Sequence, residues 1–535
     1  MGFFLLMVSN KIIKILKVYK ESKDDSSKVS EDDETKIKVN EFTSKIAFVY
    51  EKLRNTLDYK EEHLLRKNAV ERIISRSFWE IKNNPLAEDL LKELIRAGYL
   101  PNNAISEYKI IVIDAIFQKY YKLLIKIKEQ KTWSEFNKFQ KWILDFCACE
   151  IESNLYNSQR EQALVEAMYR SLESRVQVAN ENFSDAEKDL QLYIAVNKAL
   201  VRSDNKMIGF LVFKSFYPEW LEAPDNEFIN EIASRISKIK EDIDKEIKNP
   251  LSAKFFSICK KQAIYYKVLE GVIVNHLKNI DEIFNIRDRF EDETRETAEI
   301  NYDIAKKKFR TGLVRSIVYI LITKVVIALL VEVPLDLYIF HGFSYTTIGI
   351  NVTFPPILML LVGLSIRLPS EKNTSAIVSE LVKIVYNEED TSPIVVKPSR
   401  KRSKFTLFFF GLLYLTTYVV TFGLIVLGLI RLHFSIPSGV IFILFLCIVS
   451  FFAVRVKTTA KEWVVLKTSQ RFFATIFDFF FMPIIKVGRW LSLEFSKINI
   501  FMFILDFIIE APFKTFLSIF EDWMSYVREK KDEIY

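Results

Sequence analysis

The chain has 535 residues and a formal net charge of +7, from 75 Lys and Arg against 68 Asp and Glu. Because the basic residues are interleaved with acidic ones, the charge pattern argues against a nucleic-acid partner. The four cysteines are too few and too scattered for a disulfide framework, which excludes a disulfide-stapled secreted domain and fits a reducing compartment.

Residue types that build common catalytic and metal sites are sparse. Glycines do not cluster before the first long apolar segment, which argues against a phosphate-binding loop, and the histidines are isolated from one another. Cys147 and Cys149 form a C-x-C pair without a second Cys or His pair at ligand spacing, so we interpret them as small buried residues rather than zinc ligands. We therefore expect no catalytic site, no cofactor and no metal.

Residues 1–20 have the pattern of a basic amphipathic helix. Lysines at positions 11, 14, 17 and 20 recur among Ile, Leu, Val and Tyr. Such a helix lies on an anionic membrane surface or packs on the following domain, and the sequence leaves both alternatives open. Residues 21–35 are rich in Ser, Asp, Lys and Glu and predict a flexible linker.

Residues 36–310 predict a helical cytosolic domain, a bundle or irregular array of helices. Apolar residues recur at helical spacing, and strand-like alternation is hard to find. Thr132 with Glu135, and Ser184 with Glu187, match the capping box, in which a hydroxyl and a carboxylate satisfy free backbone donors at a helix start. Residues 290–310, dense in both charge signs, predict a helix that runs directly into the membrane.

Four apolar segments predict a transmembrane region over residues 311–456, so the fold class is all-α. The segments 317–339, 348–366, 405–430 and 436–454 are each close to the roughly 20 residues that cross a hydrocarbon core. Basic residues concentrate before the first span, between the second and third, and after the fourth. Under the positive-inside rule both termini therefore lie in the cytosol.

Residues 457–535 predict amphipathic, membrane-associated helices. The apolar stretch 472–485 contains Asp478 and Pro483 and is too short to cross a bilayer. In residues 498–520 polar side chains recur at spacings of four or seven, which favours an interfacial or bundle-packed helix over a fifth span.

The second span contains the consecutive residues Pro355 and Pro356. Two prolines remove two backbone donors and disfavour helix just before them, so we expect the span to begin as an extended or broken chain. Irregular backbone at membrane depth is tolerated where it is buried in protein or lines a wet cavity.

Ionisable residues in the first span mark the candidate site. Lys324, Glu332 and Asp336 share one broad helix face, and the short connection to the second span brings Asn351 and Thr353 to a similar depth. One hypothesis is an outward polar pocket made by the two carboxylates, the amide and the hydroxyl. In the structural alternative, the lysine snorkels to the cytosolic surface and Asp336 lies near the outer one, which leaves only Glu332 in need of a partner.

Two stretches, NVTFPPILMLLVGLSIRLPSEKNT and YEKLRNTLDYKEEHLLRKNAVERII, carry a resemblance to known proteins. Over most of its length the chain resembles uncharacterised helical multi-pass membrane proteins of small, AT-rich bacterial genomes. The resemblance implies a bacterial plasma membrane and no particular activity.

The expected function is that of a membrane-anchored interaction or scaffolding protein. Its expected partners are the lipid bilayer and a protein that binds the helical cytosolic domain. The alternative is an ion or small-solute transporter that uses the polar pocket of the first transmembrane hairpin.

Overall fold

The structure, a computed structural model, is all-α apart from two short strands in the residues that it describes. These residues are 8–28, 35–55, 61–78, 86–156, 159–179, 183–222, 224–338, 345–364, 369–386, 393–397, 403–460, 462–466, 472–497 and 511–532. The chain divides into two compact units. Unit 1 comprises Met1–Asn285, Lys383–Pro398 and Ile509–Tyr535, and unit 2 comprises Ile286–Val382 and Ser399–Ile508.

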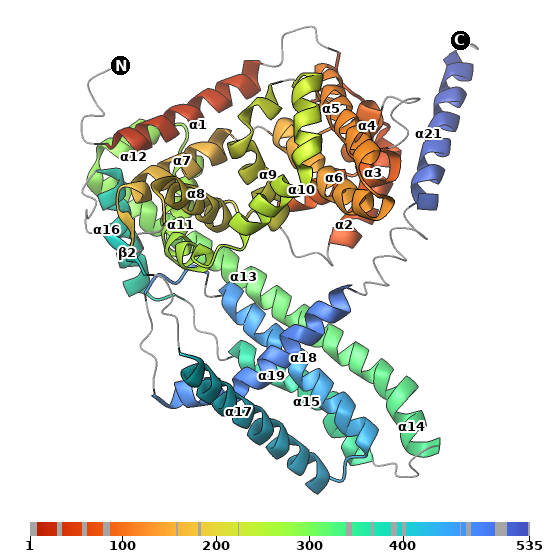
Figure 1. Cartoon of the computed structure of the whole chain (residues 1–535), viewed down its shortest axis with the longest axis vertical. Helices are drawn as coiled ribbons and strands as arrows, with labels where there is room; N and C mark the ends of the chain where they lie inside the picture. Colours follow the sequence, from red (N-terminus) through yellow and green to blue (C-terminus); the bar gives the residue numbers. More distant parts are fainter. Residues whose placement is uncertain are drawn as a thin grey trace. The chain divides into compact units, whose positions relative to one another are not determined.

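Unit 1 is built mainly from the N-terminal half of the chain (Figure 1). Both predicted helix starts are confirmed: the Glu135 carboxylate accepts from the Thr132 N–H, and the Ser184 hydroxyl accepts from the Glu187 N–H. Its elements, in chain order, are α1 (Asn10–Lys28), α2 (Glu41–Asn55), α3 (Glu62–Ser77), α4 (Leu86–Arg96), α5 (Tyr108–Gln130), α6 (Trp133–Leu155), α7 (Gln159–Glu173), β1 (Val176–Val178), α8 (Asp185–Leu200), α9 (Asn205–Phe216), the 3-10 helix η2 (Pro218–Leu221), α10 (Asn226–Ile247), α11 (Ser252–Asn275) and α12 (Ile280–Asn285).

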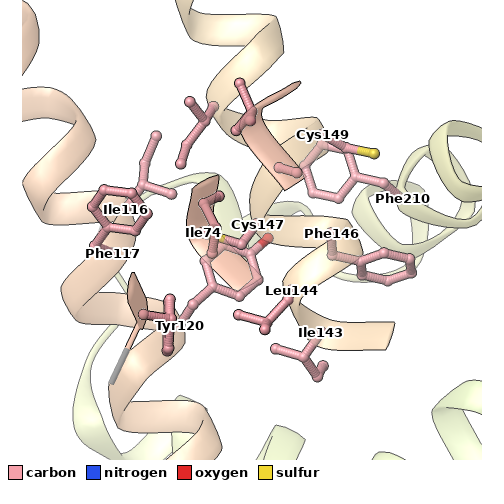
Figure 2. Packing of buried hydrophobic residues seen from close by; sticks show 14 of the residues in the cluster. Ile74, Ile116, Phe117, Tyr120, Ile143, Leu144, Phe146, Cys147, Cys149 and Phe210 are labelled. Atoms are coloured by element: carbon pink, nitrogen blue, oxygen red, sulfur yellow. The ribbon is translucent and has the colours of Figure 1, made fainter. Parts of the chain in front are cut away.

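A core of unit 1 is formed by aliphatic and aromatic side chains from α3, α4, α5, α6, α9 and α10, and Figure 2 shows part of it. Phe146 of α6 packs edge-to-face on Phe210 of α9, with ring centroids 5.8 Å apart. Cys147 and Cys149 lie on the same helix, are free and are buried, as the sequence predicts for small core residues.

Helix α1 packs on unit 1 through its apolar face. Ile12, Ile15 and Tyr19 are fully buried there, and α1 lies against α7. Of the two alternatives for this helix, the structure therefore supports packing on the domain. The helix also continues to Lys28, so the prediction of a linker that begins at residue 21 is wrong for residues 21–28, while residues 29–34 lie outside the described part. Local i,i+4 pairs such as Lys17 with Glu21 support the extra turns.

A two-stranded parallel sheet joins distant parts of the sequence. Strand β1 pairs with β2 (Ile394–Val396), with Val176 opposite Ile394 and Val178 opposite Val396. Strands of three residues are too short to show an alternating pattern, which is why the sequence did not reveal them. The loop between the second and third spans therefore contributes to unit 1 and not to unit 2 alone.

Among its described residues, unit 2 contains four helices long and apolar enough to cross a membrane, and they correspond in order to the four predicted spans. The charged segment before the first span is helical and continuous with it, as predicted. The elements are α13 (Arg287–Ile327), the π-helical turn η3 (Ala328–Glu332), α14 (Val333–Tyr338), α15 (Tyr345–Leu364), α16 (Glu371–Val385, whose last residues belong to unit 1), α17 (Lys404–Arg431), α18 (Ile436–Ala460) and α19 (Phe472–Lys497).

The two prolines of the second span do not break it, so that prediction is wrong. Helix α15 runs without interruption from Tyr345 to Leu364 and contains both Pro355 and Pro356. Each proline removes one intrahelical bond, but the remaining bonds keep the segment helical, and both rings are buried against neighbouring helices. The irregular turn instead occurs in the first span, where η3 precedes Pro334. A π turn is wider than an α turn, which relieves the clash between a proline ring and the preceding turn.

The C-terminal part contains two described helices. Helix α19 extends well past the apolar stretch 472–485 and packs on α17 and α18, with Ile484 buried between them. Residues 498–510 lie outside the described part, so the predicted helix over 498–520 is described only from the start of α21 (Ala511–Asp532). This last helix belongs to unit 1.

Candidate functional site

The centre of the candidate site is a buried ion pair within the first span. Lys324 Nζ lies 2.5 Å from Glu332 Oε1, and both side chains are fully buried. Residues eight apart lie about 12 Å apart along a regular helix, so the two long side chains meet by extending towards each other along the helix surface. The Lys324 ammonium also lies 4.6 Å from the ring centroid of Phe445 on α18, a cation–π contact.

Asn351 of α15 connects this pair to two other helices. Its amide nitrogen donates to Glu332 Oε2 at 2.6 Å and to the backbone carbonyl of Ser438 at 3.3 Å. Asn351 is fully buried, so these bonds form where water does not compete. The first span, α15 and α18 therefore share one polar contact region inside unit 2.

Asp336 is held at the N-terminus of α18. Its carboxylate accepts from Ser435 Oγ at 2.5 Å and from Ser438 Oγ at 3.1 Å, and only 2% of its surface is exposed. The Ser435 hydroxyl also accepts from the Ser438 N–H at 3.3 Å, which caps the helix. A helix N-terminus carries partial positive charge, so this position favours a carboxylate.

Four of the five residues that the sequence singled out come together, and Thr353 does not. Its side chain is exposed and donates to the carbonyl of Gly349 in its own helix at 2.7 Å. Lys324 does not snorkel to the surface, because its ammonium is buried on Glu332. Lys324 is therefore the partner of Glu332. The structural alternative, in which the lysine reaches the cytosolic surface and leaves Glu332 without a partner, is wrong on this point.

Sequence reasoning missed Ser435, Ser438 and Phe445. The first two had a signal: the run Ser-Ile-Pro-Ser after a short connection is a helix start, with a hydroxyl cap and a proline in the first turn. A carboxylate near the end of the preceding hairpin is the natural partner of such a start. Phe445 had no signal, because it is one of many aromatic residues in an apolar helix.

Two oxygen atoms of the site have no hydrogen-bond partner in the described part of the chain. They are Asn351 Oδ1 and Thr347 Oγ1, which lie one helical turn apart on the same face of α15. With Lys324, Glu332 and Asp336 all ionised, the cluster carries one excess negative charge. The contacts between Asn351 and Glu332, between Asn351 and Ser438, and between Asp336 and the two serines join the first span, α15 and α18.

A separate charged network in unit 1 joins α3, α6 and α9. The ammonium of Lys206 donates to the carboxylates of Glu71 and Asp145, and its distance to Asp145 Oδ1 is 2.8 Å. Burial, followed by the charge of Glu71, raises the pKa of Asp145 to about 6. The same lysine keeps the pKa of Glu71 below its usual range.

No family model matches the chain, and neither a curated protein nor a solved structure matches it. The interpretation of the site therefore depends on its own geometry.

Proposed function

We propose that this protein is a multi-pass integral membrane protein that anchors an interaction or scaffolding domain, unit 1, to the membrane. The observation that carries the proposal is the pairing inside unit 2. Lys324, Glu332, Asn351, Asp336 and two serines satisfy one another across the first span, α15 and α18. Such a cluster fixes the helices of a membrane anchor, because the Asn351 amide nitrogen and the Asp336 carboxylate find their partners only when the helices are together.

The three chain segments that make up unit 1 support the location of both termini on one side of the membrane. Two candidate spans separate the N-terminal part from Lys383–Pro398, and two more precede α21, yet all three segments belong to unit 1. An even number of crossings returns the chain to the same side. The same argument favours α19 as a helix that packs on the spans without crossing. The positive-inside pattern and the resemblance to bacterial proteins assign this side to the cytosol of a bacterial cell.

An exposed apolar stripe on α5 supports binding of a protein partner by unit 1. Tyr108 is 62% exposed and Ile111 is 66% exposed, and they lie three positions apart on one helix face. Large contiguous apolar patches mark contact surfaces, and this pair is the position at which we place the centre of such a surface.

The test is crosslinking and affinity purification of the full-length protein from its own membrane. We expect one protein to be retrieved by the wild type and lost with Tyr108→Ser combined with Ile111→Ser. The control variant Gln118→Glu, on the same exposed side of α5, retains the partner. A wild-type protein that retrieves no specific partner contradicts the scaffold function.

Ion transport is the second candidate, and one observation favours it. The unpaired oxygens of Asn351 and Thr347 and the excess negative charge are features that attract a cation. In proteoliposomes, transport predicts an ion-dependent flux that Asp336→Asn abolishes without reducing insertion. A wild type without flux under varied ion gradients eliminates this candidate.

A further inference from the structure

Unit 1 contains a cavity of about 410 Å³ between its helices. Its walls come from α3, α6, α7, α8 and α9, and Cys149 and Phe210 on these walls are labelled in Figure 2. Cavities of roughly 300 to 1,000 Å³ between helices are the usual size of small-molecule sites. The cavity lies in a different unit from the ion-pair cluster, so the proposed anchor function does not involve it.

Two charged side chains in the wall of this cavity are not neutralised by the protein. Glu161 of α7 and Lys214 of α9 form no hydrogen bond or ion pair within the described part of the chain, either with each other or with other groups. The other two acidic residues of the wall differ. Glu152 accepts from Arg66 at 2.9 Å, and Glu166 accepts from Arg170 at 2.7 Å.

His63 adds an unsatisfied polar atom to the same wall. Its Nε2 atom is buried and has no hydrogen-bond partner among the described residues. Burial lowers the pKa of His63, which favours the neutral imidazole. His63 and Glu161 also line an adjoining cavity of about 130 Å³. A buried polar atom without a partner is rare in proteins and marks a place where a ligand or water completes the bonding.

Burial disfavours the charged forms of both Glu161 and Lys214. Burial, then the nearby charges of Glu152 and Glu270, raises the pKa of Glu161 to about 7. Burial alone lowers the pKa of Lys214. An ammonium near Glu161 and a carboxylate near Lys214 relieve these two penalties together.

The rest of the wall is mixed. Its apolar part comes from Val165, Val201, Met207, Phe210 and Leu211, and its polar part includes Ser153, Tyr156, Gln162, Tyr193, Asn197 and Ser203. The apolar part suits a hydrophobic group, and Glu161 and Lys214 suit one charge of each sign on the same molecule.

We propose that this cavity binds a free amino acid with an apolar side chain. Glu161 binds the α-ammonium group, with His63 Nε2 as a second acceptor, and Lys214 binds the α-carboxylate. The apolar part of the wall contacts the side chain.

The test uses isothermal titration calorimetry on the full-length protein in detergent micelles. The probes are L-leucine and two analogues that each lack one charge, 3-methylbutan-1-amine and 4-methylpentanoate. We expect L-leucine to bind, and each analogue to bind about tenfold more weakly or worse, because each loses one charge-assisted contact. Equal affinity of all three probes, or no binding of L-leucine at about 10 mM, overturns the proposal.

Variants assign each charge to its contact. Glu161→Gln weakens L-leucine and the amine but not 4-methylpentanoate, whereas Lys214→Gln weakens L-leucine and the carboxylate but not the amine. Glu166→Gln is the matched control, because Glu166 lies in the same wall but is already paired with Arg170. Variants that weaken all probes alike, with unchanged thermal unfolding, contradict the assignment of the two contacts.

Discussion

In the buried ion pair of Lys324 with Glu332, substitution of one partner alone is expected to cost more stability than substitution of both. Both groups are fully buried, and each has the other as its main counter-charge. Removal of one partner leaves an uncompensated charge in a dry environment, while removal of both leaves none. The pair is therefore best judged from single and double variants together.

We expect Lys324→Met to lower the free energy of unfolding of the membrane unit by about 3–5 kcal/mol, because the Glu332 carboxylate remains buried without its cation. Lys324→Met combined with Glu332→Leu should recover at least half of that loss. Thermal unfolding in detergent micelles measures both. Thr353→Val, which changes an exposed hydroxyl bonded only to its own helix, is the control and should have no effect. A double variant as unstable as the single one contradicts a structural ion pair.

Asp145 makes a testable contribution to the pH dependence of unit 1. Its ordinary pKa of 3.8 is raised to about 6 in the fold by burial and by Glu71. Between these two values the folded protein keeps a proton that the unfolded chain has released, so stability falls as pH rises through about 6 and the loss is complete above it.

Asp145→Asn should therefore stabilise unit 1 at pH 7.5 by about 1–2 kcal/mol and have little effect at pH 4, where the native residue is also neutral. The amide oxygen still accepts from Lys206, so that contact is preserved. Denaturant unfolding of the full-length protein at the two pH values measures the difference. A shift of equal size at both pH values would contradict the titration of Asp145 as its cause.

The backbones of α18 and α19 approach each other closely at Gly488. A Cβ atom on Gly488 would lie 1.9 Å from the backbone carbonyl oxygen of Cys447, a distance that no side-chain movement relieves. The contrast is Gly411 in α17, where no atom lies within 4 Å of the added Cβ.

Gly488→Ala is expected to destabilise unit 2 by about 1–3 kcal/mol through overpacking. Gly411→Ala should be neutral or stabilising by up to about 1 kcal/mol, because alanine favours a helix. Thermal unfolding of both variants in the same detergent provides the comparison. Equal effects of the two substitutions would show that α19 does not pack on α18 at this position.

The elements differ in how far their sequence predicts them. The four spans and the capping boxes were predictable because each depends on local patterns of hydrophobicity and hydroxyl spacing. The break predicted at the prolines of α15 does not occur. The prediction considered only the backbone donors that proline lacks, whereas the rest of this long apolar helix stays helical on both sides of the prolines. Strands β1 and β2 depend on which distant segments meet, and local patterns do not contain that information.

The segment Lys383–Pro398 ties the loop between the spans to the N-terminal unit. Besides the strand pairing, the Ser9 N–H donates to the carbonyl of Val385 at 2.8 Å, and the Tyr386 hydroxyl donates to the carbonyl of Phe284 at 3.1 Å. Segments of one packed unit lie on the same side of a membrane.

Single-cysteine labelling in whole cells tests this topology. Tyr345→Cys, at the start of α15, should react with an impermeant maleimide from outside, whereas Val395→Cys, in β2, should react only after the cells are opened. Both positions are exposed, and the four native cysteines are buried, so background labelling is low. Labelling of Val395→Cys in intact cells would reverse the orientation.

The pairing of β1 with β2 also sets an order of events during synthesis. Val176–Val178 leaves the ribosome long before Ile394–Val396, and the first two spans are made in between, with a delay on the order of 10 s at usual rates of elongation. Unit 1 therefore reaches its final form only after the first hairpin has been inserted. Until the second strand leaves the ribosome, β1 keeps an unpaired edge, which is a template for aggregation.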